Sequence, residues 1–365
     1  MDIGRRDLLL AAASLTVASV AGGARAASGR KIGYAIVGLG YYGLNVILPQ
    51  FVNCQHSRVT ALVSGDPTKA HATAARYGVP ERSIYSYETF NQIHDNPDVD
   101  VVYVILPNSL HAEYTIRAAT AGKHVLCEKP MATSVAECEA MIAACRKAGR
   151  KLMIGYRCHF EATNLEAMRL ARSGAAGHIR YVRSEHGFVQ GDPSKWRLKK
   201  AMAGGGSLMD MGVYSLQAAR YMTGEEPVSV TARESTDRGD PRFTEVEDMI
   251  EWLLKFPSGA IASCLSTYSA NQNHVLLVGD QGRIEMEPAT RYDGNRLWTG
   301  KDGRAQDLTP PPGPGKSQFA GQLDHMADCI RADRPPIVSG DEGLRDMRII
   351  EAIYQSAREA RTVLL

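Results

Sequence analysis

The stretch Ile32-Gly-Tyr-Ala-Ile-Val-Gly-Leu-Gly-Tyr-Tyr-Gly43 decides the fold of this chain. It begins with a short apolar run of the kind that forms a buried strand, and Gly38, Gly40 and Gly43 follow with the spacing G-x-G-x-x-G. Glycines at this spacing, in front of a helix, permit a tight turn and let a pyrophosphate approach the backbone at the helix N-terminus. A glycine-rich turn without a ligand is the alternative, but the strand before it and the helix after it favour a dinucleotide site.

Strand-like and helical stretches alternate from this motif as far as residue 155. The expected strands are 31–37, 58–64, 99–106, 123–127 and 151–155, and the expected helices are 42–52, 67–77, 109–121 and 134–147. Such alternation predicts a doubly wound parallel sheet. Val101-Val-Tyr-Val-Ile-Leu106 is apolar throughout, as expected of a strand covered on both faces. The sequence therefore predicts an α/β fold with an N-terminal Rossmann domain at residues 31–155.

The pattern changes after residue 155, where alternating strands follow one another with fewer helices between them. The expected strands are 179–190, 227–235, 247–256, 260–269, 273–279 and 282–287, and the expected helices are 161–173, 207–222, 317–332 and 342–360. This pattern predicts an α+β domain at residues 156–365, with helices on one face of a large, mostly antiparallel sheet. The open face of that sheet needs a cover, so we expect a homodimer through the C-terminal sheet.

An export signal precedes the first strand. Arg5 and Arg6 open the apolar run 8–21, and Ala24-Arg25-Ala26 fits a small-residue cleavage site. The apolar run is shorter than the ~20 residues that a membrane-spanning helix needs. We therefore predict a twin-arginine signal peptide at residues 1–26, export to the periplasm, and no membrane association after cleavage. An exported protein that uses a dinucleotide would have to carry its cofactor and recharge it on site, because no free pool exists there.

Composition excludes several other classes of protein. The formal net charge is only +2, and no basic stripe indicates a nucleic-acid partner. The seven cysteines are an odd number without a C-x-x-C pair, so we expect free thiols and no disulfide framework. We also predict no bound metal.

The end of the second expected strand bears on the choice between NAD and NADP. An NAD enzyme places a carboxylate there to bind the ribose 2′-hydroxyl, whereas this strand ends at Ser64 and Gly65, and Lys69 follows in the next helix. A hydroxyl and a cation suit a 2′-phosphate. Asp66 lies close by and weakens this inference, although it also reads as a helix N-cap. The sequence favours NADP as the cofactor.

Three polar residues stand at positions typical of a reaction site. Lys129 directly follows the strand 123–127, at the strand end where such sheets bind ligands. Asp210 and Tyr214 follow Gly204-Gly-Gly-Ser207 with the spacing i, i+4, which puts both side chains on one helical face. Each of these residues could equally be an ordinary surface residue, so position alone does not assign a role.

Several motifs together resemble the GFO/IDH/MocA oxidoreductases. They are the glycine motif, Glu128-Lys129-Pro130, the run Gly-Gly-Gly-x-Leu-x-Asp-x-Gly at 204–212, Ile105-Leu-Pro-Asn-Ser-Leu-His111, Ile154-Gly-Tyr-Arg-Cys-His159 and Trp196-Arg197. The resemblance covers essentially the whole mature chain. Within the family it is strongest to the branch of glucose–fructose and aldose–aldose oxidoreductases. It implies a Rossmann domain, a second domain with an open-faced sheet, tightly held NADP(H) and sugar substrates.

The resemblance also implies roles for individual residues. Lys129, Asp210 and Tyr214 correspond to the catalytic group, and these three together with Arg157 are the expected sugar contacts. Most of the family has histidine where this chain has Tyr214. A phenol is a weak base at neutral pH, but a lysine cation nearby favours its ionised form, so we expect Lys129 and Tyr214 to act as one unit. The expected cofactor contacts are Gly38, Leu39, Gly40, Tyr41, Tyr42, Gly43, Ser64, Gly65, Lys69, Tyr87, Ile105, Leu106, Pro107, Asn108, His111, Glu128, Lys129, Arg157, Trp196 and Arg197.

One departure from the glucose–fructose relatives leaves alternatives open. Those enzymes carry a proline-rich arm before the Rossmann domain that covers the cofactor of a neighbouring subunit, whereas only residues 27–30 separate the predicted cleavage site from the first strand here. We expect an aldose to be oxidised at C1 to the lactone and a second sugar, an aldose or a ketose, to be reduced to the alditol in a ping-pong cycle. The alternatives are an NADP-dependent sugar or inositol dehydrogenase with exchangeable cofactor, a non-catalytic sugar-binding protein, and an enzyme acting on glycan ends.

Overall fold

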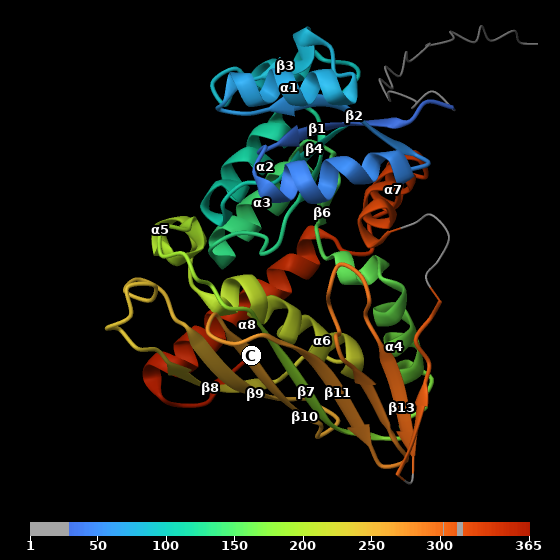
Figure 1. The fold of residues 1–365 in the computed structure, drawn as a ribbon, viewed down its shortest axis with the longest axis vertical. Helices are drawn as coiled ribbons and strands as arrows, with labels where there is room; N and C mark the ends of the chain where they lie inside the picture. The colour runs from blue at the N-terminus through green and yellow to red at the C-terminus, as the bar shows by residue number, and fades with distance from the viewer. Residues whose placement is uncertain (1–28, 302, 312–316) are drawn as a thin grey trace, which may run out of the picture. The chain divides into compact units, whose positions relative to one another are not determined.

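Six parallel strands form the first sheet of the structure, a computed structural model that describes residues 29–301, 303–311 and 317–365. Their order is β3-β2-β1-β4-β5-β6, and Figure 1 shows them with the helices α1, α2 and α3 beside them. The bounds are β1 (Ile32–Val37), β2 (Ser57–Val63), β3 (Ile84–Tyr85), β4 (Val101–Val104), β5 (His124–Cys127), β6 (Leu152–Ile154), α1 (Pro67–Tyr77), α2 (His111–Thr120) and α3 (Val135–Lys147).

The first sheet forms because its strands are apolar on both faces. Every residue of β1 and of β4 is buried, which is what helices on both sides of a parallel sheet require. The predicted doubly wound sheet is confirmed. The sequence missed only the two-residue strand β3, which is too short to show a period. It also predicted one helix at 42–52, where the chain forms a π-helical segment η1 (Tyr42–Ile47) and a 3-10 segment η2 (Leu48–Asn53).

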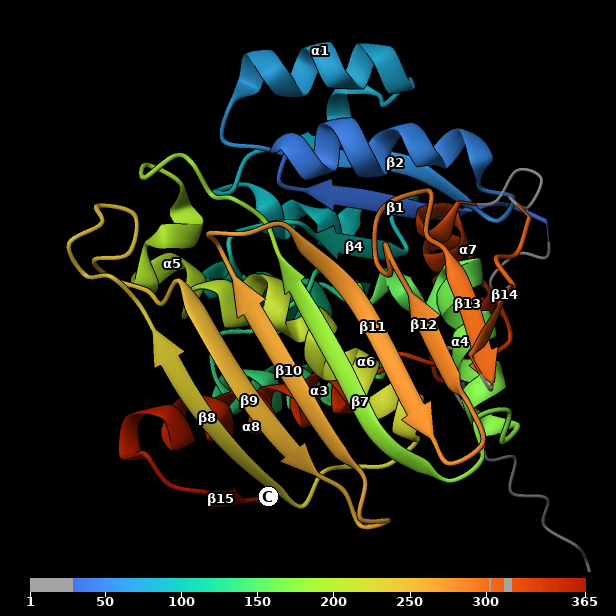
Figure 2. The ribbon, with the colours of Figure 1, turned by 60° about the horizontal axis from the view of Figure 1, so that its bottom comes forward.

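The second sheet has nine strands in the order β14-β13-β12-β11-β7-β10-β9-β8-β15. All neighbours pair antiparallel except β7 and β10, which run parallel. Figure 2 shows this sheet face on. The bounds are β7 (Ile179–Gly187), β8 (Ser229–Ser235), β9 (Met249–Lys255), β10 (Ile261–Thr267), β11 (Gln272–Gly279), β12 (Arg283–Met286), β13 (Leu297–Lys301), β14 (Arg304–Asp307) and β15 (Val363–Leu364).

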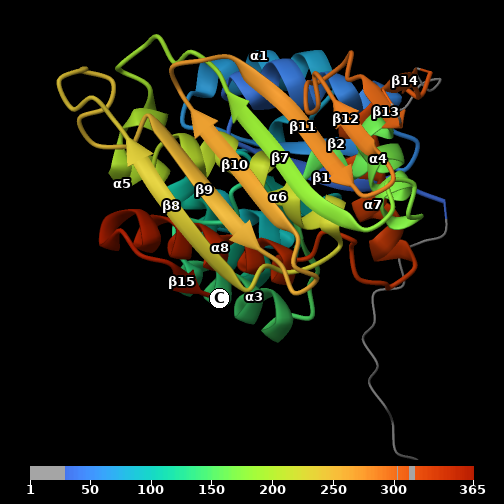
Figure 3. The same cartoon turned by 90° about the horizontal axis from the view of Figure 1, so that it is seen from below.

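Helices lie on one face of the second sheet, and Figure 3 shows α6 and α8 behind its strands. Side chains alternate accordingly, because Trp252 and Leu254 of β9 are buried against the helices while Leu253 between them is 47% exposed. Ile261 of β10 is 46% exposed on the same open face. The predicted mostly antiparallel sheet with one open face is confirmed. The helices of this half are α4 (Ala162–Arg172), α5 (Lys200–Ala203), α6 (Val213–Thr223), α7 (Gln318–Arg331) and α8 (Gly340–Glu359).

The helix α7 returns to the first sheet although it comes late in the chain. Its residues Phe319, Leu323 and Met326 share an apolar core with β1 and β2. Tyr34 in β1 donates a hydrogen bond to the carbonyl of Leu323 at 2.7 Å. The Asp324 carboxylate accepts from the backbone N–H groups that precede β2. Residues 31–365 form one compact unit. The helix α7 helps to join its two sheets, because Gln318 at its start donates to the carbonyls of Arg291 and Tyr292 in the loop after β12.

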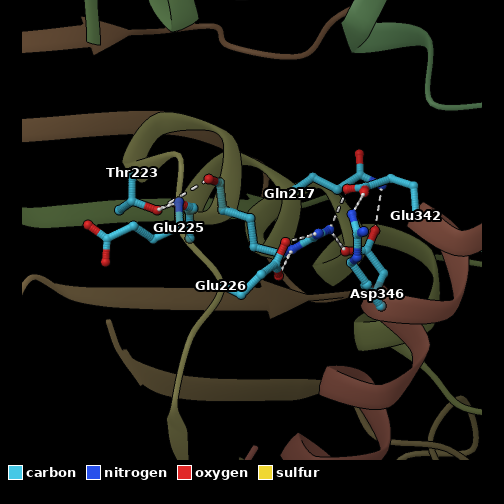
Figure 4. Close-up of polar contacts among 9 residues, drawn as sticks. Gln217, Thr223, Glu225, Glu226, Glu342 and Asp346 are labelled. Carbon is cyan, nitrogen blue, oxygen red and sulfur yellow. Dashed lines mark hydrogen bonds and ion pairs between the residues drawn. The ribbon is translucent and has the colours of Figure 1, made fainter. Parts of the chain in front are cut away.

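A buried ion cluster fixes α6 against α8. Arg220 on α6 is 3% exposed, and its guanidinium contacts Glu226 at 2.6 Å, Glu342 at 2.7 Å and Asp346 at 2.5 Å. Gln217 donates to the same Asp346. Figure 4 shows these polar contacts between the two helices. A buried arginine needs such partners, and they hold in place the helix on which Tyr214 lies.

No helix in the described ranges is long and apolar enough to cross a membrane. The predicted signal peptide at residues 1–26 lies outside the described residues. The seven cysteines all lie among the described residues, are buried and form no disulfide, as the sequence predicted.

Candidate active site

The glycine motif forms an open cradle after β1. Gly38 has φ +100°, and a Cβ there would lie 2.1 Å from the carbonyl oxygen of Ile105. A Cβ on Gly43 would lie 2.5 Å from the carbonyl oxygen of Gly38. A Cβ on Gly40, by contrast, would meet no atom within 4 Å. The first and third glycines therefore make the turn possible, while the second leaves its backbone open to the space in front, as a pyrophosphate requires.

The end of β2 presents a hydroxyl and a cation to the same space. Asp66 is the N-cap of α1, because its side chain accepts the backbone N–H of Lys69 at 3.0 Å. This bond lowers the pKa of Asp66, so the carboxylate is ionised and engaged by the protein. Ser64 accepts the N–H of Asp66 through its hydroxyl, and the Lys69 ammonium lies 3.6 Å from Asp66. The donor set fits a 2′-phosphate better than a ribose hydroxyl.

Most of the predicted site residues line one cavity of about 1060 Å³. It extends from the glycine cradle to the helix-covered face of the second sheet, so one continuous space is large enough for a dinucleotide beside a small substrate. The predicted residues on its wall are Gly38, Leu39, Gly40, Tyr41, Tyr42, Ser64, Gly65, Lys69, Tyr87, Ile105, Leu106, Pro107, Asn108, Glu128, Lys129, Arg157, Trp196, Arg197, Asp210 and Tyr214.

Two predicted cofactor contacts lie behind the cavity wall. Gly43 packs against the backbone of Gly38. The buried His111 ring joins the carbonyl of Leu106 to that of Pro130, at 2.9 Å in each case. Burial lowers the pKa of His111, which favours the neutral ring, and a neutral ring donates to one of these two carbonyls. The structure therefore gives His111 a place as a brace between the two loops that follow β4 and β5.

Asp210 is held by three partners at the far end of the cavity. Lys129 Nζ lies 3.0 Å from its Oδ1, and Arg197 Nε and the Tyr268 hydroxyl lie 3.0 Å and 3.1 Å from its Oδ2. Burial alone would raise the pKa of Asp210, but the two cations outweigh burial and hold it below its usual range. Burial also acts to lower the pKa of Lys129, and Asp210 outweighs it so that this pKa is raised. The pair therefore stays charged near neutral pH.

Tyr214 lies between two cations. Lys129 Nζ is 4.7 Å from the centroid of its ring, and the guanidinium carbon of Arg157 is 4.9 Å from it. Arg157 Nε–H also donates to the Tyr214 hydroxyl at 3.2 Å. The ring thus lies between two positive charges, and one of them also contacts its hydroxyl. Lys129, Arg157, Asp210 and Tyr214 together form the reaction corner of the cavity.

Glu128 lies beside this corner and has its own buried partners. Tyr103 of β4 donates to its carboxylate, and Gln322 of α7 donates in turn to the Tyr103 hydroxyl. Burial raises the pKa of Glu128. The strand β4, the loop after β5 that carries Glu128, and the helix α7 thus meet at one polar network beside the cavity.

Sequence analysis missed a group of aromatic and polar residues on the cavity wall. Most of them come from loops that follow strands of the second sheet, where no motif marks them. Asn273 lies in β11, and Met209 and Met211 lie in the π-helical segment η8 (Leu208–Gly212), inside the glycine-rich run 204–212. Their abundance of aromatic and amide side chains is typical of sugar sites. They are Phe188, Gln190, Lys195, Met209, Met211, Tyr268, Asn273, Thr290 and Tyr292.

A separate group of possible metal ligands lies on the second sheet. His274, Glu285 and Glu287 bring one ligand atom each to within 4.8 Å of one another. The His274 ring already contacts Glu285 at 3.1 Å, and Arg283 lies 3.7 Å from the same carboxylate. The charge of Glu285 is thus balanced within the protein.

The chain belongs to the GFO/IDH/MocA oxidoreductase family. Residues 32–156 match the family's NAD-binding Rossmann fold, and residues 164–285 match the GFO/IDH/MocA C-terminal domain. The resemblance inferred from the motifs is confirmed.

Three individual relatives are named as oxidoreductases or dehydrogenases of sugars. The structure of an aldose–aldose oxidoreductase from Caulobacter crescentus, complexed with glycerol, is 60% identical, with a TM-score of 0.90 over 92% of this chain and 100% of that one. An NADP(+) D-xylose 1-dehydrogenase of Haloarcula marismortui is 29% identical over 93% of this chain and 94% of that protein. A second NADP(+) D-xylose 1-dehydrogenase, from Haloferax volcanii, is 30% identical over 91% of this chain and 99% of that protein.

Proposed function

We propose that this chain oxidises an aldose at C1 and reduces a second sugar with the same, tightly bound NADP(H). The chain is an NADP-dependent oxidoreductase acting on the CH–OH group of sugars, as its relatives are. The finer proposal adds two half-reactions at one site. It rests most on one observation, the Tyr214 ring held between Lys129 and Arg157 in a cavity that continues into the glycine cradle.

Bound NADP supplies the hydride acceptor for the first sugar and the hydride donor for the second. In the first half-reaction the aldose C1 loses its hydrogen as hydride, and its hydroxyl proton passes to Tyr214, which leaves the lactone. In the second, the carbonyl carbon of an open-chain sugar gains the hydride and its oxygen gains the proton from Tyr214, which gives the alditol. The same residues serve both directions, so the kinetics are ping-pong.

The charges at the site favour Tyr214 as the proton carrier. Asp210 has a lowered pKa and Lys129 a raised one, so neither exchanges a proton readily near neutral pH. Asp210 instead fixes the position of the Lys129 ammonium. Lys129 then stabilises the oxygen of the reacting carbon as charge develops on it.

Export and assembly belong to the same proposal. The predicted twin-arginine signal at residues 1–26 would deliver the folded, loaded enzyme to the periplasm. A homodimer through the open face of the second sheet would cover Leu253 and Ile261. Light scattering of the Leu253→Glu variant tests this: a monomer with normal turnover supports the interface, and an unchanged dimer contradicts it.

Product analysis tests the finer proposal. The purified mature protein is passed over gel filtration, its nucleotide content is measured, and it is given glucose alone without added cofactor. Retained NADP(H) and equal amounts of gluconate and sorbitol support the proposal. Sorbitol only after fructose is added would point to a glucose–fructose reaction. Loss of the nucleotide, with turnover only on added NADP+, would instead favour a dehydrogenase with exchangeable cofactor. The relatives from Haloarcula marismortui and Haloferax volcanii are named as NADP(+) dehydrogenases of D-xylose.

Lys129→Ala separates an enzyme from a sugar-binding protein. The enzyme is expected to lose turnover yet keep its nucleotide, because Lys129 contributes to the reaction corner and the cradle is made by other residues. A protein that only binds sugar would show no turnover in the wild type.

A further inference from the structure

Arg157 occupies a position unlike that of a ligand-binding arginine. It begins the 3-10 segment η6 (Arg157–Phe160) after β6, and it is 5% exposed. Its guanidinium carbon lies 4.9 Å from the ring centroids of both Tyr214 and Tyr292. The cation is therefore enclosed by two aromatic rings at the edge of the cavity.

The protein itself engages four of the five N–H donors of Arg157. Nε–H donates to the Tyr214 hydroxyl at 3.2 Å. Nη1 donates to Gln318 Oε1 at 2.7 Å and to the carbonyl of Arg291 at 3.4 Å, and Nη2 donates to the carbonyl of Thr290 at 2.6 Å. An arginine that clamps a sugar or a phosphate presents a free fork of donors, and this fork is already occupied.

We propose that Arg157 is a positioning residue that holds and activates Tyr214, rather than a contact for sugar or nucleotide. This rests on the proposed role of Tyr214 as proton carrier. The Nε–H bond fixes the direction of the phenol oxygen, and the guanidinium places a fixed positive charge beside that oxygen for the proton transfer. Gln318 at the start of α7 and the backbone at 290–291 fix the guanidinium in turn, so the C-terminal part of the chain sets the geometry of the reaction corner.

Several titratable groups surround Tyr214, and the two cations that contact its ring are Arg157 and Lys129. Asp210 is ionised but is engaged by Lys129 and Arg197. The His186 ring, 5.8 Å away, is neutral because burial lowers its pKa to about 3. Burial raises the pKa of Tyr42, of Tyr292 and of Glu128, which disfavours the charged form of each. Removal of Arg157 thus removes one of the two cations beside the phenol ring.

A double-mutant cycle tests the proposal. The variants Arg157→Met, Arg157→Lys and Tyr214→Phe, and the double variants, are compared by the rate at which an aldose reduces saturating NADP+ in a single half-reaction. Arg157→Met is expected to slow this rate about 100-fold, within the usual contribution of proton transfer, with the KM for sugar nearly unchanged. Its pH–rate profile should differ from that of the wild type, because a fixed charge beside the reacting oxygen is lost. Arg157→Lys is expected to restore part of the rate.

The decisive comparison is made in the Tyr214→Phe background. If Arg157 acts through Tyr214, then adding Arg157→Met or Arg157→Lys to Tyr214→Phe changes the residual rate less than threefold. An undiminished effect in that background, or a raised KM with unchanged kcat, would show that Arg157 contacts the sugar and would overturn the proposal. Arg157→Lys serves alone in this cycle if Arg157→Met does not fold.

A matched control separates activation from loss of stability. Arg220→Lys changes another buried arginine, in the cluster between α6 and α8, and is expected to lower the melting temperature while keeping the wild-type pH profile. If Arg220→Lys shifts that profile as far as the Arg157 variants do, the shift reflects general loosening and the proposal fails. The half-reaction uses added NADP+, so it is independent of nucleotide retention. A wild type without any aldose-dependent reduction would instead reject the proposed function.

Discussion

The glycine cradle and the reaction corner are built in opposite ways. The cradle comes from one continuous stretch of sequence, and it works because side chains are absent at Gly38, Gly40 and Gly43. The corner takes Lys129, Arg157 and the pair Asp210 and Tyr214 from three separate segments, and polar contacts between these side chains fix their positions. A local motif thus suffices to build the cradle, whereas the corner depends on how distant parts of the chain pack.

The largest effect is expected in the corner, from Tyr214→Phe. This variant removes the proton carrier and leaves the cradle intact. Its turnover should fall about 1000-fold, while the bound nucleotide stays at the wild-type level. Steady-state rates and nucleotide content of the purified protein measure both quantities, with Tyr77→Phe on α1 as the control. A Tyr214→Phe enzyme within threefold of the wild-type rate would show that another group carries the proton.

The cradle is tested by two substitutions of the same size. Gly43→Ala forces a Cβ to 2.5 Å from the backbone of Gly38, whereas a Cβ on Gly40 meets no protein atom. Gly43→Ala should therefore lower the free energy of unfolding by about 2 kcal/mol. Gly40→Ala should fold normally but retain less nucleotide. Chemical denaturation and nucleotide content distinguish the two, and equal stability of both variants would contradict this account of the turn.

The pH dependence of stability separates Asp210 from an exposed carboxylate. Its pKa is lowered in the folded protein, so it stabilises the fold above the unfolded pKa of ~3.9, and this contribution is lost as the pH falls toward the folded pKa. Asp210→Asn leaves Lys129 and Arg197 uncompensated and should cost about 3 kcal/mol at pH 7. Denaturation curves should show this difference shrinking below about pH 4. A difference independent of pH would contradict the ion pairing.

The smallest effect is expected at Lys69. Lys69→Ala removes the cation expected beside the 2′-phosphate of NADP, and a charge-assisted hydrogen bond of this kind accounts for about a tenfold preference. The ratio of affinities for added NADP+ and NAD+ should fall by that factor, while Arg76→Ala at the other end of α1 leaves it unchanged. An unchanged ratio in Lys69→Ala would place the selectivity elsewhere on the wall.

The sequence allowed much of the fold to be predicted, for reasons that differ between the two halves. The strands of the first sheet are continuous apolar runs, and the alternation in β9 revealed an open face on the second sheet. The return of α7 to the first sheet was not predicted, because amphipathic periodicity does not state which sheet a helix covers. Tyr268 and Tyr292 were missed for a related reason, since they lie in loops that only packing brings to Asp210 and Arg157. That the motif residues line one cavity could be predicted, because the carboxyl ends of parallel strands meet at the same edge of the sheet.

Transfer of deuterium between two sugars tests the central claim most directly. The purified enzyme, without added cofactor, is given glucose that carries deuterium at C1, and the products are analysed by mass spectrometry. The proposed cycle predicts sorbitol with two deuterium atoms at C1, one from its own glucose and one delivered from a second glucose, together with an equal amount of gluconate. Sorbitol with a single deuterium, or gluconate without sorbitol, would contradict a hydride that stays on one bound nucleotide between two sugars.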